Sequence, residues 1–386
     1  MNTNDQPQLP DEKELLFQIA LTMIPNVGSV TARTLLSYCG SPAEVFSSSQ
    51  KQLLQIPGIG PAIVSQLSKP SVLADAEKEL SFIREHQITP LFFTDPGYPR
   101  RLRQLPDAPV MLYSRGNASL NTARIVAIIG TRSPTDYGRT MTDRLVEDLA
   151  PYGIHIVSGL AYGIDIRAHR ACLRHQVPTT GVLGSGFRNI YPGTHTSVAH
   201  KMMDRGSLLT EFHSYTKPTR ENFPMRNRII AGLADAVIVI ETAARGGSII
   251  TAELANGYHK DVFAIPGHVT SERSSGCHKL IRTHKAALIE CGADVAYFMG
   301  WDQALSVKNT QQQLPLDLPE NESQLLEMLS KHPASSLDYL AYHLHTTPGN
   351  LSSTLLQLEI KGLIRSMPGN RYLAADASGI PYTNKE

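Results

Sequence analysis

The chain has 386 residues, of which 41% are hydrophobic and 18% charged, and its formal net charge is +1. This composition fits a soluble globular protein of two or three domains and excludes an intrinsically disordered chain. Because 36 Lys and Arg are balanced by 35 Asp and Glu, any nucleic-acid binding must come from a local cationic patch. We find no apolar run of transmembrane length and no signal-peptide pattern, so we expect a cytoplasmic protein without membrane contact.

The four cysteines, Cys39, Cys172, Cys277 and Cys291, are scattered and form no CxxC pair. This distribution predicts reduced thiols in a cytoplasm and no disulfide framework. Histidine and cysteine crowd between His259 and Cys291, but their spacings match no zinc finger or zinc ribbon. We therefore expect neither a metal site nor a cofactor.

Residues 1–88 are predicted to form a helical domain. Apolar residues recur at helical spacing in Glu14–Ile24, Ser29–Cys39, Lys51–Ile56 and Pro61–Leu67. Two related turns, IPNVG ending at Gly28 and IPGIG ending at Gly60, each join two short helices, as in a tandem helix-hairpin-helix (SAM-like) module. In such a module the turn glycines let backbone N–H groups approach a DNA phosphate, but the first turn has Asn26 where glycine is expected. A purely structural helical domain with glycine turns explains the pattern equally well.

Residues 89–300 alternate strand and helix patterns. The predicted strands are Ile125–Ile129, Ile154–Ser158, Thr180–Leu183, Ser207–Thr210, Ala236–Ile240 and Val262–Ile265. This alternation predicts an α/β fold with a doubly wound parallel sheet, whose ligands bind beyond the carboxyl ends of the strands.

Residues 301–319 are rich in Gln and Pro and are predicted to be a linker. Residues 320–386 follow the winged-helix outline, with helices at Glu322–Ser330, Ser336–Leu344 and Pro348–Lys361 before a hairpin turn at Pro368–Asn370. The third helix has one Lys and one Glu, which favours a protein contact or weak DNA contact over sequence-specific reading.

Small-residue loops that suit phosphate follow the predicted strands. They contain Gly130-Thr131-Arg132, then Ser158-Gly159 with Gly163 and Asp165, then Gly184-Ser185-Gly186, and finally Gly246-Gly247-Ser248. Asp165 and His169 would be an acid–base pair in an enzyme, but no nucleophile accompanies them. We therefore favour a structural role for Asp165, in which it holds its loop.

The stretch from Lys217 to Glu241 places the cations Lys217, Arg220, Arg226 and Arg228 and the aromatic Phe223 before a buried strand. Cations interleaved with an aromatic suit a ligand that has phosphates and flat bases. The pattern itself fits both a short nucleotide and a single strand of nucleic acid.

Six motifs occur in the order found in the DNA-processing protein family DprA, also called Smf: VAIIGTR, VSGLAYGID, GSG…YP, FPMRNRIIAGLADAVIVIE, SIITAELA and VFAIPG. The resemblance spans about residues 91–290. It implies an extended Rossmann-like domain that binds single-stranded DNA without sequence preference and forms homodimers. It also implies protection of incoming DNA during natural transformation, loading of the RecA recombinase past single-strand-binding protein, and no enzymatic activity.

The resemblance also implies which residues bind DNA. The phosphate-binding positions fall on Gly130, Thr131, Arg132, Ser158 and Gly159, the basic position on Arg220, the base contact on Phe223, and the RNR motif on Arg226, Asn227 and Arg228. The loops with Gly163, Asp165, Gly184, Ser185, Gly186 and Ser248 support them. The chain departs from the family pattern at residues 246–248 and 276–285.

Two other functions remain open. A nucleoside-monophosphate phosphoribohydrolase uses a similar sheet, and Glu241 or Glu253 would then act in catalysis. A transcription regulator would act through the winged helix. We also expect at least one of Arg226 and Arg228 to be structural, for instance through a salt bridge with Asp235 or Glu241.

Overall fold

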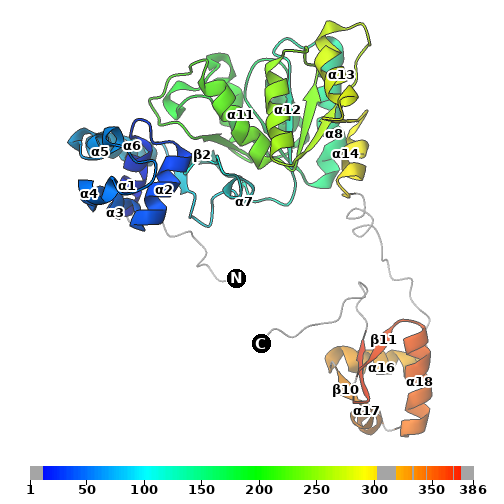
Figure 1. Cartoon of the computed structure of the whole chain (residues 1–386). Coiled ribbons are helices and arrows are strands. Elements are labelled where there is room, and N and C mark those ends of the chain that lie inside the picture. The colour runs from blue at the N-terminus through cyan, green and yellow to red at the C-terminus, as the bar shows by residue number, and fades with distance from the viewer. Residues whose placement is uncertain (1–11, 302–318, 333, 345, 368, 375–386) are drawn as a thin grey trace. The chain divides into compact units, whose positions relative to one another are not determined.

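The computed structural model of the protein describes residues 12–301, 319–332, 334–344, 346–367 and 369–374 (Figure 1). The chain divides into two compact units, one ending at Trp301 and the other within residues 302–386. Most of the predicted linker lies outside the described residues. None of the helices in the described ranges is long and apolar enough to cross a membrane.

The first unit begins with six helices: α1 (Glu12–Thr22), α2 (Ser29–Cys39), α3 (Pro42–Ser47), α4 (Gln50–Leu53), α5 (Pro61–Leu67) and α6 (Pro70–Glu85). The two predicted turns have the same geometry, because Asn26 has a φ of 65° and Gly58 a φ of 81°. Gly28 and Gly60 then cap α2 and α5. At this position, where glycine is expected, Asn26 thus adopts a left-handed conformation, which asparagine tolerates better than most residues.

These helices share a hydrophobic core with the edge of the sheet. Leu21, Leu35 and Phe82 belong to the same buried cluster as Met111 and Tyr113 of the sheet. The domain boundary at residue 88 therefore stays a prediction, since one core extends across it.

The central sheet has nine strands: β1 (Thr89–Phe92), β2 (Met111–Gly116), β3 (Ile125–Gly130), β4 (His155–Ser158), β5 (Thr179–Val182), β6 (Ser207–Thr210), β7 (Ala236–Ile240), β8 (Asp261–Ala264) and β9 (Ala287–Leu288). Their order is β1-β2-β6-β5-β4-β3-β7-β8-β9. Strands β3 to β9 are parallel, which confirms the predicted Rossmann-like sheet, and the six predicted strands all form. The antiparallel strands β1 and β2 and the short edge strand β9 were not predicted.

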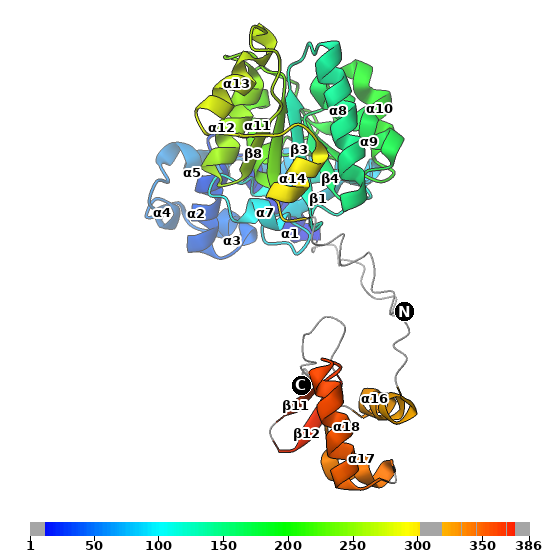
Figure 2. The same ribbon diagram turned by 90° about the vertical axis from the view of Figure 1, so that its right-hand side faces the viewer.

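Helices cover both faces of this sheet, which explains why its strands are apolar on both sides (Figures 1 and 2). Val126 and Ile128 of β3 pack with α8 (Asp136–Leu149), α9 (Ile164–His175) and α14 (Gly292–Phe298). Ala127 and Ile129 pack on the opposite face, with α11 (Asn222–Leu233), α12 (Gly247–Gly257) and α13 (Ser275–Arg282). The unit also contains α7 (Arg100–Arg103) and α10 (Thr196–Met202).

The strand order reverses at β3. From β3 the chain proceeds through β4, β5 and β6 on one side, and through β7, β8 and β9 on the other. Ligands of open α/β sheets bind at such a reversal, outside the carboxyl ends of the strands. The loops after β3, β4 and β7 are therefore the places to look for a site.

The second unit has the winged-helix fold, as predicted. It contains α16 (Glu320–Lys331), β10 (Ser335–Ser336), α17 (Leu337–His343), α18 (Pro348–Ile360), β11 (Ile364–Met367) and β12 (Arg371–Ala374). Leu325, Leu340, Leu355 and Leu358 lie in its core. Its third helix, α18, has Glu359 as its one charged residue, so a strongly cationic reading face is not built on this helix.

Candidate functional site

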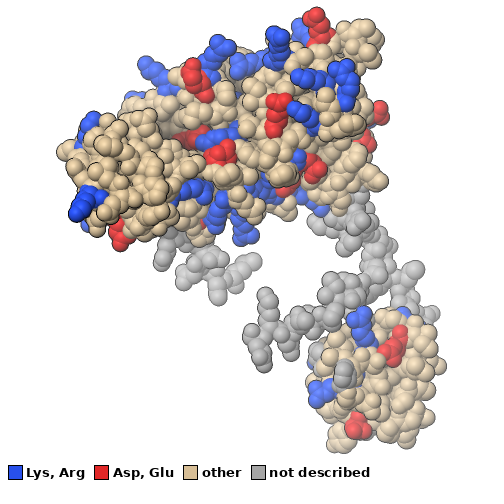
Figure 3. All heavy atoms as spheres, viewed as in Figure 1, with Lys and Arg blue, Asp and Glu red and all other residues tan. Residues whose placement is uncertain are grey.

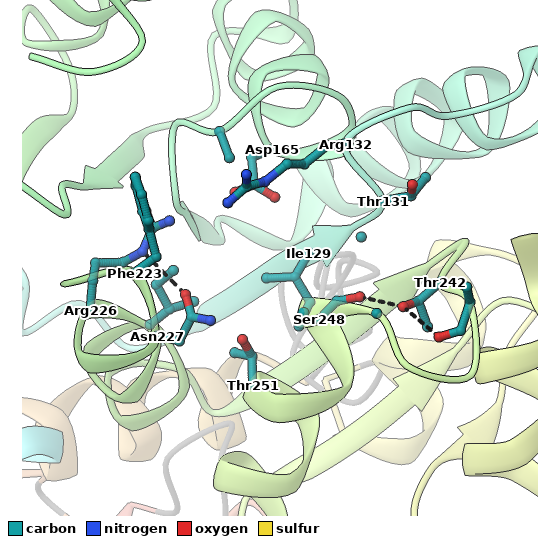
Figure 4. A pocket seen from close by; sticks show the side chains of 16 residues that line it. Ile129, Thr131, Arg132, Asp165, Phe223, Arg226, Asn227, Thr242, Ser248 and Thr251 are labelled. Atoms are coloured by element: carbon teal, nitrogen blue, oxygen red, sulfur yellow. Dashed lines mark hydrogen bonds between the residues drawn. The ribbon is translucent and has the colours of Figure 1, made fainter. Parts of the chain in front are cut away.

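A pocket of about 260 Å³ opens at the carboxyl ends of β3 and β7 (Figure 4). We call it the central pocket; its lining residues are Ile129, Gly130, Thr131, Arg132, Ala161, Asp165, Phe223, Arg226, Asn227, Ile230, Thr242, Ala243, Gly246, Gly247, Ser248 and Thr251. The reversal of strand order thus brings together loops that are more than 100 residues apart in the chain.

One wall of the central pocket is formed by a cation and an aromatic ring. The guanidinium carbon of Arg132 lies 5.4 Å from the centre of the Phe223 ring. Tyr191 lies 5.8 Å from the same ring, centre to centre. Gly184 leaves room for the Phe223 ring, because a Cβ at Gly184 would come within 2.9 Å of Phe223 Cδ1. Arg132 is exposed and forms no ion pair with a described carboxylate, so its charge is available to an anion.

A second cation, Arg226, lies buried at the base of the pocket. Its Nη1 donates hydrogen bonds to the carbonyl oxygens of Gly159 and Val182, and its Nε donates to Asn227 Oδ1 at 3.2 Å. Burial lowers the pKa of Arg226 to about 10, and the nearby Asp165 opposes this shift. Arg226 therefore stays charged at neutral pH and ties together the ends of β4 and β5.

Asp165 is the one carboxylate among the described residues that line the central pocket. Burial raises its pKa, and Arg226 acts in the opposite direction. The carboxylate accepts hydrogen bonds from the backbone of Ala161 and Gly159, so it holds the loop after β4. His169, one turn further along α9, is buried and its Nδ1 lies 2.7 Å from Thr179 Oγ1. Burial lowers the pKa of His169 to about 3, which keeps the ring neutral.

The N-terminus of α12 forms the opposite wall. Its N-cap is Gly246, which has no side chain to bond the first backbone N–H groups of the helix. The hydroxyl of Ser248 donates to Thr242 Oγ1 at 2.7 Å and so fixes this turn against the end of β7. Open amides at a helix N-terminus favour a phosphate or another anion.

Close backbone packing at the pocket depends on Gly163, which has a φ of 83°. A Cβ at this position would lie 2.6 Å from the carbonyl carbon of Arg132. Glycine thus lets the loop after β4 touch the loop that carries Arg132.

Most of the predicted site residues meet here. Gly130, Thr131, Arg132, Asp165, Phe223, Arg226, Asn227 and Ser248 line the central pocket, and Gly159 and Gly184 line a narrow cleft beside it with Tyr162, Tyr191 and Pro192. Ser158 and Ser185 are buried below the surface, where their hydroxyls donate to the carbonyl oxygens of Ile128 and Asn189, both at 2.6 Å. Gly186 packs against the backbone of Ser214.

The structure does not bring Arg220 and Arg228 into the central pocket. Arg220 is exposed on the loop before α11. Arg228 forms an ion pair with Glu211 and donates to the carbonyl oxygen of Asp107. The predicted partners were therefore wrong, because Asp235 pairs with Arg101 at 2.7 Å and Glu241 accepts a hydrogen bond from the backbone N of Thr135 at 2.8 Å.

Sequence reasoning missed several lining residues, among them Thr242, Ala161 and Ile230. Thr242 is the second residue after the apolar core of β7, a position that follows directly from the rule that ligands sit beyond strand ends. Ile230 faces the pocket from α11, and nothing in the sequence distinguishes it from the other apolar residues of that helix.

Comparison with known proteins identifies the family. The family model for DNA recombination-mediator protein A matches residues 89–300, which is more than half of the chain. The chain belongs to the DprA/Smf family of DNA-processing proteins. A model of the DprA winged-helix domain matches residues 309–370, and a SAM-like helix-hairpin-helix tandem matches residues 18–69.

Relatives from several bacteria agree with this assignment. Protein Smf of Synechocystis is 31% identical, and the match covers 93% of this chain and 98% of the relative. The X-ray structure of DprA from Streptococcus pneumoniae superimposes with a TM-score of 0.60 at 32% identity, covering 73% of this chain and 96% of that one. A DprA structure from Helicobacter pylori, described for its single-stranded DNA binding mode, gives a TM-score of 0.51 at 31% identity, covering 56% and 97%.

Proposed function

We propose that the protein binds single-stranded DNA without sequence preference through the central pocket. The observation that carries this proposal is the pairing of Arg132 with Phe223, 5.4 Å apart, opposite the open N-terminus of α12. The helix terminus and the arginine suit a phosphate, and the ring suits a base of any identity.

The size of the pocket favours a polymer over a free small molecule. Its volume of about 260 Å³ is smaller than the roughly 300–1,000 Å³ of ordinary small-molecule sites. A pocket of this size holds one part of a longer ligand, whose remaining nucleotides lie outside it. Figure 3 shows further Lys and Arg side chains, with a few Asp and Glu among them, along the upper edge of the first unit in that view.

The phosphoribohydrolase alternative is less well supported. Glu241 accepts hydrogen bonds from the backbone N and the hydroxyl of Thr135 at the start of α8. Glu253 is exposed and pairs with Lys285 at 3.0 Å. Neither carboxylate lines the central pocket. Incubation with nucleoside monophosphates tests this alternative, and release of free base that is lost in Glu241→Gln would support it.

The direct test of the main proposal is fluorescence anisotropy with labelled single-stranded and double-stranded oligonucleotides over a range of salt concentrations. We expect tighter binding of single strands, similar affinities for different sequences, and an affinity that falls linearly with log salt concentration. A clear preference for duplex DNA would contradict the proposal.

We further propose, from membership of the family, that the protein protects incoming DNA in natural transformation and loads the RecA recombinase onto DNA covered by single-strand-binding protein. The test is RecA filament assembly on such covered DNA, followed by RecA ATP hydrolysis. We expect the protein to shorten the lag, and Phe223→Ala to remove this effect. An unchanged lag with the wild-type protein would contradict the loading role.

A homodimer is also part of the proposal. Apolar side chains are exposed at the β9 edge of the sheet, including Leu288 at 44%, Tyr297 at 75% and Phe298 at 54%. Exposed apolar patches of this kind mark protein interfaces. Light scattering after gel filtration should give a dimer mass, and Tyr297→Glu should shift it to the monomer.

A further inference from the structure

A groove with several arginines lies next to the central pocket and is not explained by it. We call it the arginine groove; its lining residues are Arg132, Ser133, Pro134, Arg139, Tyr162, Gly163, Ile166, Arg167, Arg170 and Arg273, and its volume is about 520 Å³. No Asp or Glu is among these residues. Figure 2 shows α8 and α9, whose N-terminal parts form the groove, side by side on one face of the sheet.

The fold gathers these arginines from four places. Arg132 follows β3, and Arg139 lies near the start of α8. Arg167 and Arg170 are three residues apart on α9, which puts them on the same side of the helix. Arg273 comes from the short 3-10 helix Glu272–Ser274, where its Nη1 donates to the carbonyl oxygen of Ser133. The sequence alone gives no sign of this cluster, because its members are spread over 142 positions, from Arg132 to Arg273.

Only part of this positive charge is neutralised within the protein. Arg139 pairs with Asp136 at 2.5 Å, and Arg167 pairs with Asp143. Asp143 is shared, because Arg174 also reaches it at 2.8 Å. In the part of the chain that the structure describes, the remaining three groove arginines, Arg132, Arg170 and Arg273, form no ion pair with a carboxylate.

The arginine groove is continuous with the central pocket. Arg132 lines both, so its guanidinium stands at the point where they meet. Tyr162 lines the groove and also the narrow cleft that contains Phe223. Tyr162 is 45% exposed, and its ring offers a second flat surface beside that of Phe223. A strand with one base against Phe223 would therefore carry its neighbouring phosphates past Arg132 toward the groove.

We propose that the arginine groove is a second section of the DNA site, which binds the backbone phosphates of the nucleotides next to the one held at Phe223. This inference rests on the proposed function. Guanidinium groups bind phosphate oxygens through paired hydrogen bonds, and three unpaired ones along a groove match the repeating charge of a nucleic-acid backbone. The groove thus lengthens the bound strand without adding sequence preference.

The test compares oligo-dT of two lengths, about 4 and about 16 nucleotides, the range of site sizes seen in single-strand-binding folds. The variant is Arg170→Gln/Arg273→Gln, which removes two exposed charges without adding opposite ones. The control is Lys201→Gln/Arg205→Gln, which removes two exposed charges near α10, on a different part of the surface. Thermal melting of both variants checks that the fold is intact.

We expect the groove variant to bind the longer oligonucleotide about tenfold more weakly, with the salt slope reduced by about 1.4, since each lost single-strand phosphate contact changes the slope by about 0.7. Its affinity for the shorter oligonucleotide, which brings fewer phosphates into the groove, should fall by a smaller factor. The control variant should bind both lengths as the wild type does.

The outcomes separate the groove from the pocket. If Phe223→Ala weakens binding of both lengths but the groove variant weakens neither, the groove proposal fails and the central pocket stands. A wild-type protein that binds neither length would overturn both proposals. Equal losses of affinity in the groove variant and the control variant would also contradict the groove proposal, because they would show an effect of general surface charge.

Discussion

The guanidinium of Arg132, in the loop after β3, lies 5.4 Å from the centre of the ring of Phe223, near the start of α11. In the proposed DNA site this pair makes two separable contributions to binding, one electrostatic and one from stacking. Arg132→Ala should lower the affinity for single-stranded DNA and reduce the salt slope by about 0.7. Arg220→Glu, on the exposed loop before α11, should act in the same direction.

Phe223→Ala should weaken binding by about 1–3 kcal/mol, the contribution of one base stacked on an aromatic ring, with an unchanged salt slope. Phe223→Tyr keeps the flat ring and is the matched control. Anisotropy titrations over a salt series measure both quantities. If Phe223→Ala retained full affinity, the base contact would have to be assigned to another ring.

Gly159 should be intolerant of a side chain. A Cβ at this position would lie 2.6 Å from Asp165 Oδ2 and would overlap the guanidinium of Arg226. Gly159→Ala is therefore expected to destabilise the protein by about 1–3 kcal/mol, the usual cost of overpacking, and to weaken DNA binding. Gly193→Ala is the control, because a Cβ there meets nothing within 4 Å. Urea unfolding measures the difference; equal stabilities of the two variants would show that the Arg226 site can relax.

The buried His155 should make stability depend on pH. Burial lowers its pKa to about 4, and Arg101 adds to this shift, whereas an unfolded histidine has a pKa of about 6.5. As the pH falls below 6.5, the unfolded chain takes up the proton first, so stability is lost until the pH reaches about 4.

The measurement compares His155→Gln with the wild type by urea unfolding at several pH values. The wild type minus variant difference in unfolding free energy should shrink by about 1.4 kcal/mol per pH unit over this window. The exposed His200→Gln controls for the loss of a histidine at the surface. A difference that stays constant with pH would contradict burial as the cause.

The two turns of the helical segment should respond differently to substitution. Gly58 has a φ of 81°, so Gly58→Ala is expected to cost about 1–2 kcal/mol. Asn26 has a φ of 65°, and Asn26→Gly should change stability little, because glycine adopts this conformation freely. Thermal unfolding of the two variants decides the matter; a larger loss in Asn26→Gly would point to contacts of the asparagine side chain.

A chain that ends after Trp301 should keep the single-stranded DNA affinity of the full chain. The first unit is compact by itself, and the central pocket and arginine groove lie within residues 129–273. Trp301 is retained because its ring packs under Arg124, 5.4 Å away. Anisotropy with both chains tests this, and a marked loss in the shorter chain would place DNA contacts in the winged-helix unit.

The parallel strands β3 to β8 were predictable because each is a short apolar run followed by small or polar residues, whereas the parallel strand β9 has only two residues and was missed. The antiparallel β1 and β2 were not, since Thr89 pairs with Ser114 across a long connection whose one helix, α7, has only four residues. Arg226 lines the central pocket and Arg228 does not, because of helix geometry. The two residues are two positions apart on α11, so their side chains point about 200° apart around the helix axis. The arginine groove could not be predicted from local sequence patterns, because its residues are brought together by long-range packing.

The helical segment and the sheet share a core, and hydrogen bonds also connect the two. Glu79 of α6 is buried and accepts hydrogen bonds from Ser214, from its backbone N at 2.8 Å and from its hydroxyl at 2.6 Å. Ser214 begins the loop that leads through Arg220 to Phe223. The helical segment is thus hydrogen-bonded to the loop that leads to Phe223, and a force applied to its two hairpin turns would be transmitted to the entrance of the central pocket.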